Sequence, residues 1–441
     1  MNIRLEAYQI SIKVLKNNDY ADNLLQQSCK KLSDTNENLE LLYRIVKGIV
    51  KMQGNLEYIC SQYTEPDKFS KTDLKIKALL YLGFFQLLHL DSIPEHAAVN
   101  ETVEIAKKLY GEKTADFVNA VLRAYLRNPQ IQYPADNAEK IAAMYSYPVD
   151  LIRKWLQLWG EEETEFLCMY YNEPAKLHIR VNNLATGKSK LIEYFRKRGV
   201  EFQVSPASPN ILITTHAPQV LQDVAFSEGY FTVQDTSAAL VVELLDPREN
   251  DSVLDLFAAP GGKATYIAER MNNTGEVIAV DKIPSKVKLI KQNMNRLQID
   301  NMILITEDAF HYGPVAPAFD RVLLDVPCSG WGVFGRKPDL RWQYHQNIEE
   351  LLKIQANALN LGASFVKPGG YLVYSTCTMN PQENEEQVNR FLKANQQFEL
   401  VQAKDFIPAD YTRDGMMHTF PNIHNMDGAF AAKMRKKAKE R

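Results

Sequence analysis

The chain has 441 residues, of which 45% are hydrophobic and 24% are charged. This composition excludes a disordered or fibrous chain, and the length is enough for about two to four domains. The formal net charge is −3, so the protein is not a strongly cationic nucleic-acid binder, and any polyanion must be held by local basic patches. The five cysteines are scattered and form no CxxC pair, which argues against a disulfide framework and a structural zinc site.

The N-terminal residues contain no apolar core beside a small-residue cleavage site, which argues against a signal peptide. The most apolar stretch, Ala78 to Leu90, is shorter than the ~20 residues that a membrane span needs. We therefore expect a cytoplasmic protein with reduced thiols and no membrane association.

The first 130 residues have helical hydrophobic spacing almost throughout. Apolar residues recur at near-helical intervals from Leu41 to Ile49. The stretch from Lys75 to Leu90 is apolar on most faces, which predicts a buried central helix. Further helices are predicted over Glu95–Leu109 and Thr114–Arg127. We assign residues 1–130 to one all-helical domain.

Residues 131–235 differ in character from the first domain. Aromatic-rich helices are predicted from Met144 to Leu158. The extended segments LHIRVN, ILITT and GYFTVQD, together with a helix from Ser189 to Arg198, then indicate a small α+β unit. Basic residues are denser here, and a solvated helix face and a binding face for a polyanion are equally open interpretations. We assign residues 131–235 to a helical linker and this small connecting domain.

From about Ser237 onward, short apolar runs alternate with helical stretches. Strands are predicted over Ser252–Phe257, Glu276–Val280, Met302–Thr306, Arg321–Asp325 and Gly370–Ser375. A helix from Pro284 to Leu297 fills one of the gaps, with proline in its first turn. This alternation is typical of a Rossmann-like, doubly wound parallel sheet, which binds ligands beyond the carboxyl ends of its strands. We assign residues 236–441 to this α/β domain.

A turn of small residues follows the first of these strands, at Phe257-Ala258-Ala259-Pro260-Gly261-Gly262-Lys263. Small residues let a ligand approach the backbone closely. Asp281 ends the second strand, where a carboxylate accepts both hydroxyls of a ribose, and Asp308 follows the third strand, where it would meet an adenine amine. The turn lacks the glycine patterns that bind phosphates, so S-adenosylmethionine fits better than NAD or ATP.

Two cysteines follow two further strands. Cys328 comes three residues after Asp325 at the end of the fourth strand, and Cys377 follows the fifth strand. A lone cysteine is usually an inert buried residue, but two at one sheet edge suit methylation of a pyrimidine at C5. One thiolate would add to C6 and the other would assist removal of the C5 proton. Asp325 would hydrogen-bond or protonate N3, provided that burial raises its pKa.

Motifs along both halves of the chain resemble known RNA-modifying proteins. The C-terminal segments resemble the successive motifs of RNA cytosine-C5 methyltransferases: DLFAAPGGKA, VIAVDK, EDAF, RVLLDVPCSGWGVFGRKPDLRW and YLVYSTCTMNPQENEEQV. The N-terminal segments RIVKGIV and FVNAVLRAYLR resemble the NusB-like RNA-binding domain. The pairing of the two halves is similar to bacterial enzymes that methylate cytosine C5 in 16S ribosomal RNA. The resemblance covers nearly the whole chain, most loosely over residues 131–235.

This resemblance implies roles for individual side chains. Cys377 would be the nucleophile that attacks C6, Cys328 would assist product release, and Asp325 would contact the base. Lys263 would belong to the site rather than lie in solvent. Members of the family often carry cysteine where this chain has Phe257, a position that the proposed reaction does not use.

The resemblance also implies the ligands. S-adenosylmethionine would be the methyl donor, held by residues 257–263, Asp281, Asp308 and Asp325, and no metal is expected. Small-subunit ribosomal RNA, free or incompletely assembled, would be the substrate of a monomeric enzyme, with the small connecting domain also binding RNA. Two other functions remain open: a transfer-RNA cytosine-C5 methyltransferase, and a noncatalytic RNA-binding assembly factor.

Two further segments allow two interpretations each. The loop after Cys328 either contacts RNA or packs against the domain through Trp331, Phe334, Arg336 and Arg341. The basic segment from Lys433 to Arg441 either contacts phosphate or forms a frayed, solvated tail.

Overall fold

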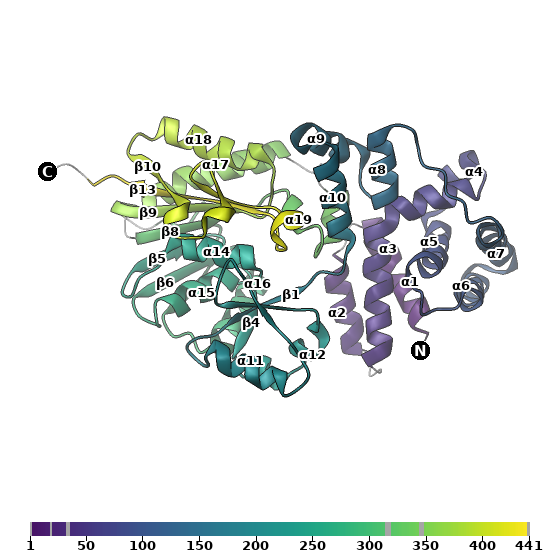
Figure 1. The fold of residues 1–441 in the computed structure, drawn as a ribbon, viewed down its shortest axis with the longest axis horizontal. Helices are drawn as coiled ribbons and strands as arrows, with labels where there is room; N and C mark the ends of the chain where they lie inside the picture. The colour runs from purple at the N-terminus through teal and green to yellow at the C-terminus, as the bar shows by residue number, and fades with distance from the viewer. Residues whose placement is uncertain (1, 18–19, 32–35, 314–318, 344–347, 439–441) are drawn as a thin grey trace. The chain divides into compact units, whose positions relative to one another are not determined.

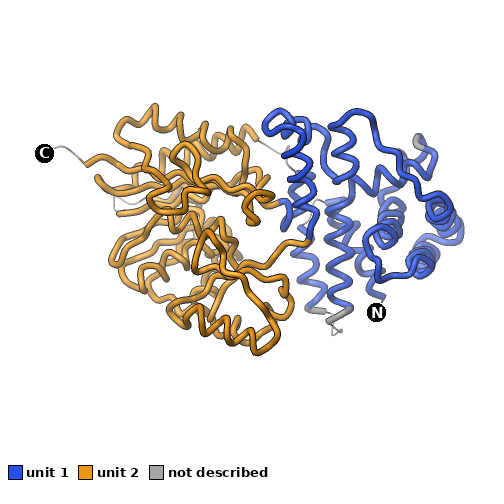
Figure 2. Tube along the Cα trace, viewed as in Figure 1, with its two compact units in different colours: residues 1–173, 334–343 blue, residues 174–333, 344–441 orange. Residues whose placement is uncertain are grey.

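The computed structural model describes residues 2–17, 20–31, 36–313, 319–343 and 348–438 (Figure 1). The chain folds into two compact units (Figure 2). Unit 1 consists of residues 1–173 and 334–343, and unit 2 consists of residues 174–333 and 344–441. The domain boundaries after residues 130 and 235 stay predictions from the sequence. Within the described ranges, no helix combines the length and the apolar character of a membrane span.

Unit 1 is helical, as predicted (Figure 1). Its helices are α1 (Ile3–Asn17), α2 (Ala21–Lys31), α3 (Asn36–Gln62), α4 (Pro66–Ser70), α5 (Leu74–His89), α6 (Glu95–Tyr110), α7 (Glu112–Arg127), α8 (Asn137–Tyr145), α9 (Val149–Trp159) and α10 (Glu161–Asn172), with the 3-10 turn η2 (Pro338–Trp342). The predicted aromatic-rich stretch is two helices, because Pro148 has no backbone N–H to continue α8 and instead precedes the first turn of α9.

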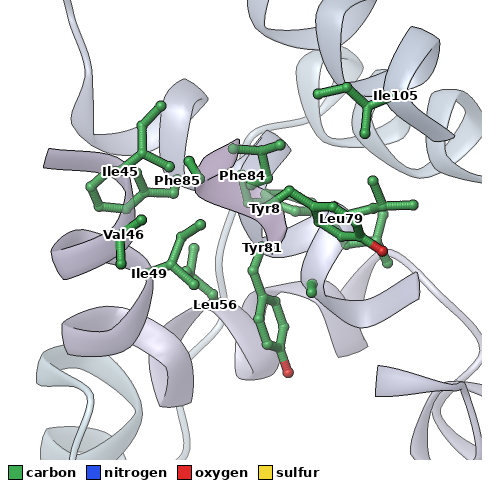
Figure 3. Packing of buried hydrophobic residues seen from close by; sticks show 14 of the residues in the cluster. Tyr8, Ile45, Val46, Ile49, Leu56, Leu79, Tyr81, Phe84, Phe85 and Ile105 are labelled. Atoms are coloured by element: carbon green, nitrogen blue, oxygen red, sulfur yellow. The ribbon is translucent and has the colours of Figure 1, made fainter. Parts of the chain in front are cut away.

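The core of unit 1 forms around α5, whose residues from Ala78 to Gln86 are all buried. This confirms the buried central helix that the sequence predicts. Figure 3 shows Phe85 of α5 close to Ile45 of α3, within the cluster that these helices share. Helix α3 has glycine at position 48, where a Cβ atom would lie 1.9 Å from the ring of Phe85. A side chain at position 48 would therefore require the ring of Phe85 to move within the core.

Residues 334–343 pack inside unit 1, although the sequence groups them with the loop after Cys328. Phe334 is fully buried, and its ring lies 6.0 Å from that of Trp155. Arg341 is also fully buried and donates to Asn172 Oδ1 at 2.8 Å, while its guanidinium lies 4.2 Å from the ring centre of Tyr147. The RNA-contacting interpretation is therefore wrong for Phe334 and Arg341, because both side chains are buried against aromatic rings of unit 1.

Trp331 and Arg336, two more residues of the same loop, differ in their exposure to solvent. Trp331, in unit 2, is 3% exposed, so packing is also the correct interpretation for that side chain. Arg336 is exposed, and either interpretation stays open for it.

Unit 2 contains a small antiparallel sheet in the order β2-β3-β1-β4. The sheet and its helices confirm the predicted small α+β unit; their bounds are β1 (Leu177–Val181), α11 (Lys188–Arg196), β2 (Gln203–Val204), β3 (Ile211–Thr214), α12 (Ala217–Leu221), α13 (Val224–Ser227) and β4 (Phe231–Val233).

Among the described residues, the large sheet of unit 2 has nine strands in the order β11-β12-β13-β9-β8-β5-β6-β7, with β10 paired to β13. Its strands are β5 (Ser252–Asp255), β6 (Glu276–Asp281), β7 (Met302–Thr306), β8 (Phe319–Asp325), β9 (Val366–Thr376), β10 (Phe398–Val401), β11 (Thr412–Arg413), β12 (Met416–Thr419) and β13 (Ala429–Lys436). Strands β5 to β9 pair in parallel, as predicted. Beyond β9 the pairing is antiparallel, so the sheet is mixed.

Helices and short 3-10 turns connect the strands of the large sheet. They are α14 (Thr236–Leu245), α15 (Gly262–Arg270), α16 (Pro284–Arg296), η1 (Trp331–Val333), α17 (Ile348–Phe365), η3 (Pro381–Glu383), α18 (Glu385–Ala394), η4 (Ala403–Asp405), η5 (Ala409–Tyr411) and α19 (Pro421–His424). Successive residues of β5 point to opposite faces: Val253 joins the core beneath α14 and α15, whereas Leu254 joins the core beneath α17 and α18. The sheet is thus covered on both faces, which leaves its strand ends for ligands.

Arg180 of β1 ties the small sheet to helix α15. Its guanidinium is buried, pairs with Glu269 at 3.0 Å, and donates to the carbonyl oxygen of Gly262 at 2.8 Å. It also donates to Thr265 Oγ1 at 3.3 Å and lies over the ring of Tyr266. The first turn of α15, which continues the glycine turn, is therefore held by a cation from the neighbouring sheet.

The C-terminal basic segment begins as a strand and not as a frayed tail, whereas phosphate contact stays an open interpretation for the exposed Arg435 and Lys437. Lys433 lies in the interior of β13, fully buried, with its Nζ 3.4 Å from the ring centre of Phe406. Burial lowers the pKa of Lys433 to about 7. Strand pairing with β9 and β10 thus overrides the charge pattern up to Lys436, and residues 439–441 lie outside the described part of the chain.

Candidate active site

The two predicted catalytic cysteines lie next to each other at the carboxyl edge of the large sheet. Strands β8 and β9 are parallel neighbours in which Asp325 pairs with Ser375, so both chains leave the sheet at the same level. The Sγ atoms of Cys328 and Cys377 are 3.3 Å apart. The hydrogen bond with Cys377, together with burial, raises the pKa of the Cys328 thiol well above its ordinary value. Cys328 is therefore a neutral thiol in the resting protein.

Lys263 and Asp325 form an ion pair beside the cysteines. Lys263 Nζ donates to Asp325 Oδ2 at 2.7 Å, and Ser375 Oγ donates to the other carboxylate oxygen at 2.9 Å. Burial alone would lower the pKa of Lys263, but Asp325 and Cys377 outweigh that effect and raise it. Lys263 is thus a charged ammonium whose field acts on both Asp325 and Cys377.

Asp255 is a member of this cluster that the sequence analysis missed. It ends β5, is 1% exposed, and accepts only a long bond from Phe257 N–H at 3.4 Å among the described residues, while its Oδ2 has no hydrogen-bond partner there. Burial and the neighbouring charge of Asp325 raise the pKa of Asp255 to about 7, against the opposing effect of Lys263. It was missed because the predicted strand runs on to Phe257, whereas β5 ends at Asp255, just as β6 ends at Asp281 and β8 at Asp325.

A cavity of about 270 Å³ opens at the ends of β5 to β8. Its walls combine apolar side chains with carboxylates and two lysines, and it is lined by Leu256, Phe257, Ala259, Asp281, Lys282, Ile283, Lys286, Asp308, Ala309, Phe310, Asp325, Val326, Pro327 and Ile354. Its size and mixed lining are typical of a site for a small organic ligand. The lysines and Ile354 were not predicted: Lys282 ends the motif VIAVDK, in which only Asp281 was assigned a role, and Lys286 and Ile354 lie in the later helices α16 and α17.

The structure brings together half of the predicted cofactor residues at this cavity, namely Phe257, Ala259, Asp281, Asp308 and Asp325. Asp281 is held in place because its carboxylate accepts the N–H of Ile283 at 2.9 Å and that of Ala259 at 3.3 Å. Asp308 accepts the N–H of Phe310 at 3.0 Å. Both carboxylates therefore have fixed orientations at the ends of neighbouring strands.

The rest of the predicted turn shapes the backbone instead of lining the cavity. Ala258, Pro260, Gly261 and Gly262 are absent from its walls. Gly261 has a φ of +95°, and a Cβ atom there would lie 2.9 Å from Ile290 Cγ2, so only glycine fits at this position. Lys263 reaches the site through its pair with Asp325.

The described residues contain no group of His, Cys, Asp and Glu side chains that could hold a metal ion. The expectation that the protein needs no metal stays a prediction.

Comparison with protein families assigns each part of the chain. Residues 1–127 match the NusB family, residues 147–221 match the ferredoxin-like domain of RsmF/B-like methyltransferases, and residues 242–435 match the family described as 16S rRNA methyltransferase RsmB/F. The first of these covers α1 to α7, and the last covers the large sheet with the cysteines and the cavity.

Full-length relatives agree with this assignment. The chain is 34% identical to a Bacillus subtilis protein named "Probable ribosomal RNA small subunit methyltransferase B", over 99% of both chains. The solved structure of PH0851 matches 99% of both chains at 27% identity, with a TM-score of 0.82. A methyltransferase homolog from Pyrococcus horikoshii matches 69% of this chain and 100% of its own at 28% identity, with a TM-score of 0.60.

The covered sheet with its acidic cavity and glycine turn is the fold of an S-adenosylmethionine-dependent methyltransferase. Identity to full-length relatives is high enough to go one step further. The chain belongs to the RsmB/F family of 16S rRNA methyltransferases, with a NusB-like helical domain at its N-terminus.

Proposed function

We propose that the protein methylates C5 of a cytosine in 16S ribosomal RNA through a covalent bond between Cys377 and C6 of the base. The observation that carries the proposal is the pair of sulfur atoms 3.3 Å apart beside the Lys263–Asp325 ion pair. C5 of a pyrimidine is a poor nucleophile, and addition of a thiolate to C6 moves electron density onto C5. C5 and C6 are bonded neighbours, so two groups that act on them must lie close together.

The cavity at the ends of β5 to β8 fits S-adenosylmethionine. Asp281 would accept the ribose hydroxyls, Asp308 would accept from the adenine amine, and apolar residues such as Phe257 would line the remainder. When bound, this cofactor supplies an electrophilic methyl group. The positive φ of Gly261 and the closeness of Ile290 require glycine in the turn that joins β5 to α15.

The surroundings of the two thiols differ in a way that favours Cys377 as the nucleophile. The ammonium of Lys263 acts electrostatically on Cys377, which stabilises a thiolate there. Cys328 has a raised pKa and is held as a thiol, so it does not compete for C6 in the resting enzyme. We therefore assign addition to Cys377 and release to Cys328.

The reaction then proceeds as addition, transfer and elimination. The Cys377 thiolate forms a bond to C6 while the C5–C6 π electrons move toward C5 and N3, where Asp325 contacts the ring. C5 would form its new bond to the methyl group while the bond from that methyl group to the sulfonium sulfur of the donor breaks, and the electron pair of the broken bond would stay on that sulfur. Bonding of Cys377 to C6 removes the hydrogen bond that raises the pKa of Cys328 most. Cys328 would then lose its own proton to water and take the C5 proton, the double bond would re-form, and the Cys377 thiolate would leave.

The experiment is methyl transfer from labelled S-adenosylmethionine to protein-free 16S RNA, with 5-methylcytidine identified by mass spectrometry of nucleosides. Cys377→Ala is expected to lower the rate by about 1,000-fold or more, as loss of a covalent nucleophile does. Cys168→Ala, which truncates a buried cysteine in α10, is the matched control and should retain activity. Methylation by Cys377→Ala at the control rate would refute the covalent mechanism, and methylation of transfer RNA in preference to 16S RNA would refute the substrate.

Cys328→Ala tests the release step separately. A protein that adds Cys377 but cannot remove the C5 proton should accumulate a covalent protein–RNA adduct, visible as a shifted band under denaturing conditions. Normal turnover without the adduct would remove Cys328 from the mechanism.

A further inference from the structure

The carboxylate of Glu383 is fully buried directly beneath the two cysteine turns. It closes the 3-10 turn η3, and each of its oxygen atoms accepts two hydrogen bonds. Oε2 accepts from the backbone N–H of Ser329 at 2.9 Å and from Gln355 Nε2 at 3.0 Å. Oε1 accepts from Ser329 Oγ and from Asn380 Nδ2 at 3.1 Å.

These bonds join the residues that directly follow the two cysteines. Ser329 follows Cys328 and Thr378 follows Cys377, and their hydroxyl oxygens are 2.8 Å apart. A backbone bond adds a second link, because Gly332 N–H donates to the carbonyl oxygen of Cys377 at 3.0 Å. The turn after β8 and the turn after β9 are therefore one hydrogen-bonded unit with Glu383 at its centre.

No arginine, lysine or histidine of the described chain forms an ion pair with Glu383. Its negative charge is stabilised by neutral donors alone, which requires all of them to keep their positions. Ser329 supplies two of those donors, so any movement of the Cys328 turn would leave the buried charge with fewer hydrogen bonds. The hydrogen bonds to Glu383 therefore oppose a movement of the Cys328 turn that would separate the two sulfur atoms.

We propose that Glu383 and Ser329 are positioning residues that hold Cys328 and Cys377 at the spacing needed to act on adjacent atoms of one pyrimidine. This inference rests on the proposed covalent function. The charge of Glu383 has a second effect that supports it, because it adds to the hydrogen bond and burial that raise the pKa of Cys328. Neither positioning residue lines the cofactor cavity, so their effect should fall on the chemical step.

The experiment compares Glu383→Gln and Ser329→Ala with Asp320→Asn. Asp320 is a matched control, since it also accepts a backbone N–H, that of Ser252 at 2.9 Å, but at the amino ends of the strands. In methyl transfer to 16S RNA, Glu383→Gln should lower kcat by about 50-fold, because a misplacement of about 1 Å can cost that much. Ser329→Ala should lower kcat by about fivefold, and KM for S-adenosylmethionine should stay within about twofold in all variants.

A second measurement reports sulfur spacing without RNA or activity. Diamide accepts two electrons and two protons as the thiols of Cys328 and Cys377 form a disulfide, and peptide mass spectrometry gives its rate. The sulfurs must close from 3.3 Å to about 2 Å, so the wild type and Asp320→Asn should react quickly and Glu383→Gln at least about five times more slowly. If Glu383→Gln does not fold, Ser329→Ala gives the same readout.

Unchanged kcat and unchanged disulfide formation in the folded variants would overturn the positioning role, whatever Cys377→Ala does. A rise in KM for S-adenosylmethionine with kcat unchanged would overturn the positioning role as well, because it would place the effect on binding. Full activity of Cys377→Ala would instead count against the covalent function, so the two failures are distinguishable.

Discussion

Two buried carboxylates at the carboxyl edge of the large sheet have opposite surroundings. Glu383 accepts two hydrogen bonds on each oxygen, whereas Asp255 accepts one long bond and leaves its Oδ2 without a partner among the described residues. Both side chains are excluded from solvent. The difference shows that burial alone does not decide what a carboxylate does, because the donors around it determine whether the negative charge is stabilised.

The two surroundings suit two tasks. A carboxylate with all its acceptor sites filled fixes the position of the chains that supply the donors, as Glu383 does for the cysteine turns. A carboxylate with an empty acceptor site and a pKa of about 7 changes charge near neutral pH, as Asp255 does beside Lys263 and Asp325. The edge of one sheet thus combines a rigid region around the cysteines with a titrating region around the cofactor cavity.

The largest expected effect comes from removing the rigid carboxylate. Glu383→Ala leaves the Ser329 N–H and Asn380 Nδ2 buried without an acceptor, while Gln355 Nε2 keeps only its bond to the Pro327 carbonyl oxygen, so the free energy of unfolding should fall by about 4 kcal/mol. Urea denaturation of the full chain measures the change. Glu386→Ala is the control, since its side chain is 53% exposed and should contribute less than about 0.5 kcal/mol. A loss below about 1 kcal/mol in Glu383→Ala would show that the network contributes little to stability.

This prediction depends on contacts that the sequence does not display. The strand ends and both cysteines were predictable because the alternation of apolar runs and helices places them at one edge. Glu383 was not, since its partner Ser329 lies 54 residues earlier and no spacing rule links a 3-10 turn to the end of another strand. Asp255 was missed for another reason, because the apolar run that predicts the strand continues to Phe257 and hides the end of β5 at Asp255.

The loop after Cys328 is a case in which the sequence leaves two interpretations open and only the structure decides between them. Its aromatic and cationic residues are equally compatible with RNA stacking and with internal packing, and composition alone does not separate the two. The structure does so for Arg341, whose guanidinium is enclosed by Tyr147 and by acceptors from α10. A charged residue becomes predictable as buried only when the acceptors that compensate it are known.

The next effect in size is a change of stability with pH caused by Asp255. Its ordinary pKa is 3.8 and its folded pKa is about 7, so between these values the folded state keeps a proton that the unfolded state has lost. The free energy of unfolding of the wild type is therefore highest, with respect to Asp255, below about pH 4. It falls as the pH rises from about 4 through 7. Asp255→Asn carries no such charge, so its stability relative to wild type should rise by roughly 3 kcal/mol from pH 4 to pH 8.

Urea denaturation at several pH values tests this sign. The groups facing Asp255 are Asp325, Asp281 and Lys263, and all three remain in the variant. Asp320→Asn should give a change of the opposite sign at lower pH: burial raises the pKa of Asp320, but the N–H of Ser252 and the ammonium of Lys367 outweigh it and lower the pKa, so the wild type should lose stability relative to this variant only as the pH falls below about 4. A pH-independent difference between wild type and Asp255→Asn would mean that Asp255 is ionised throughout this range.

The smallest effect separates a satisfied hydroxyl from an unsatisfied one. Tyr374 is fully buried and its hydroxyl donates to the carbonyl oxygen of Glu383 at 2.6 Å, so Tyr374→Phe should lower the free energy of unfolding by about 1 kcal/mol. Tyr147 is also buried, but its hydroxyl has no partner among the described residues, so Tyr147→Phe should be neutral or slightly stabilising. The two variants remove the same atom from similar depths. Equal losses would mean that burial of the hydroxyl, rather than its bond to the Glu383 turn, determines the cost.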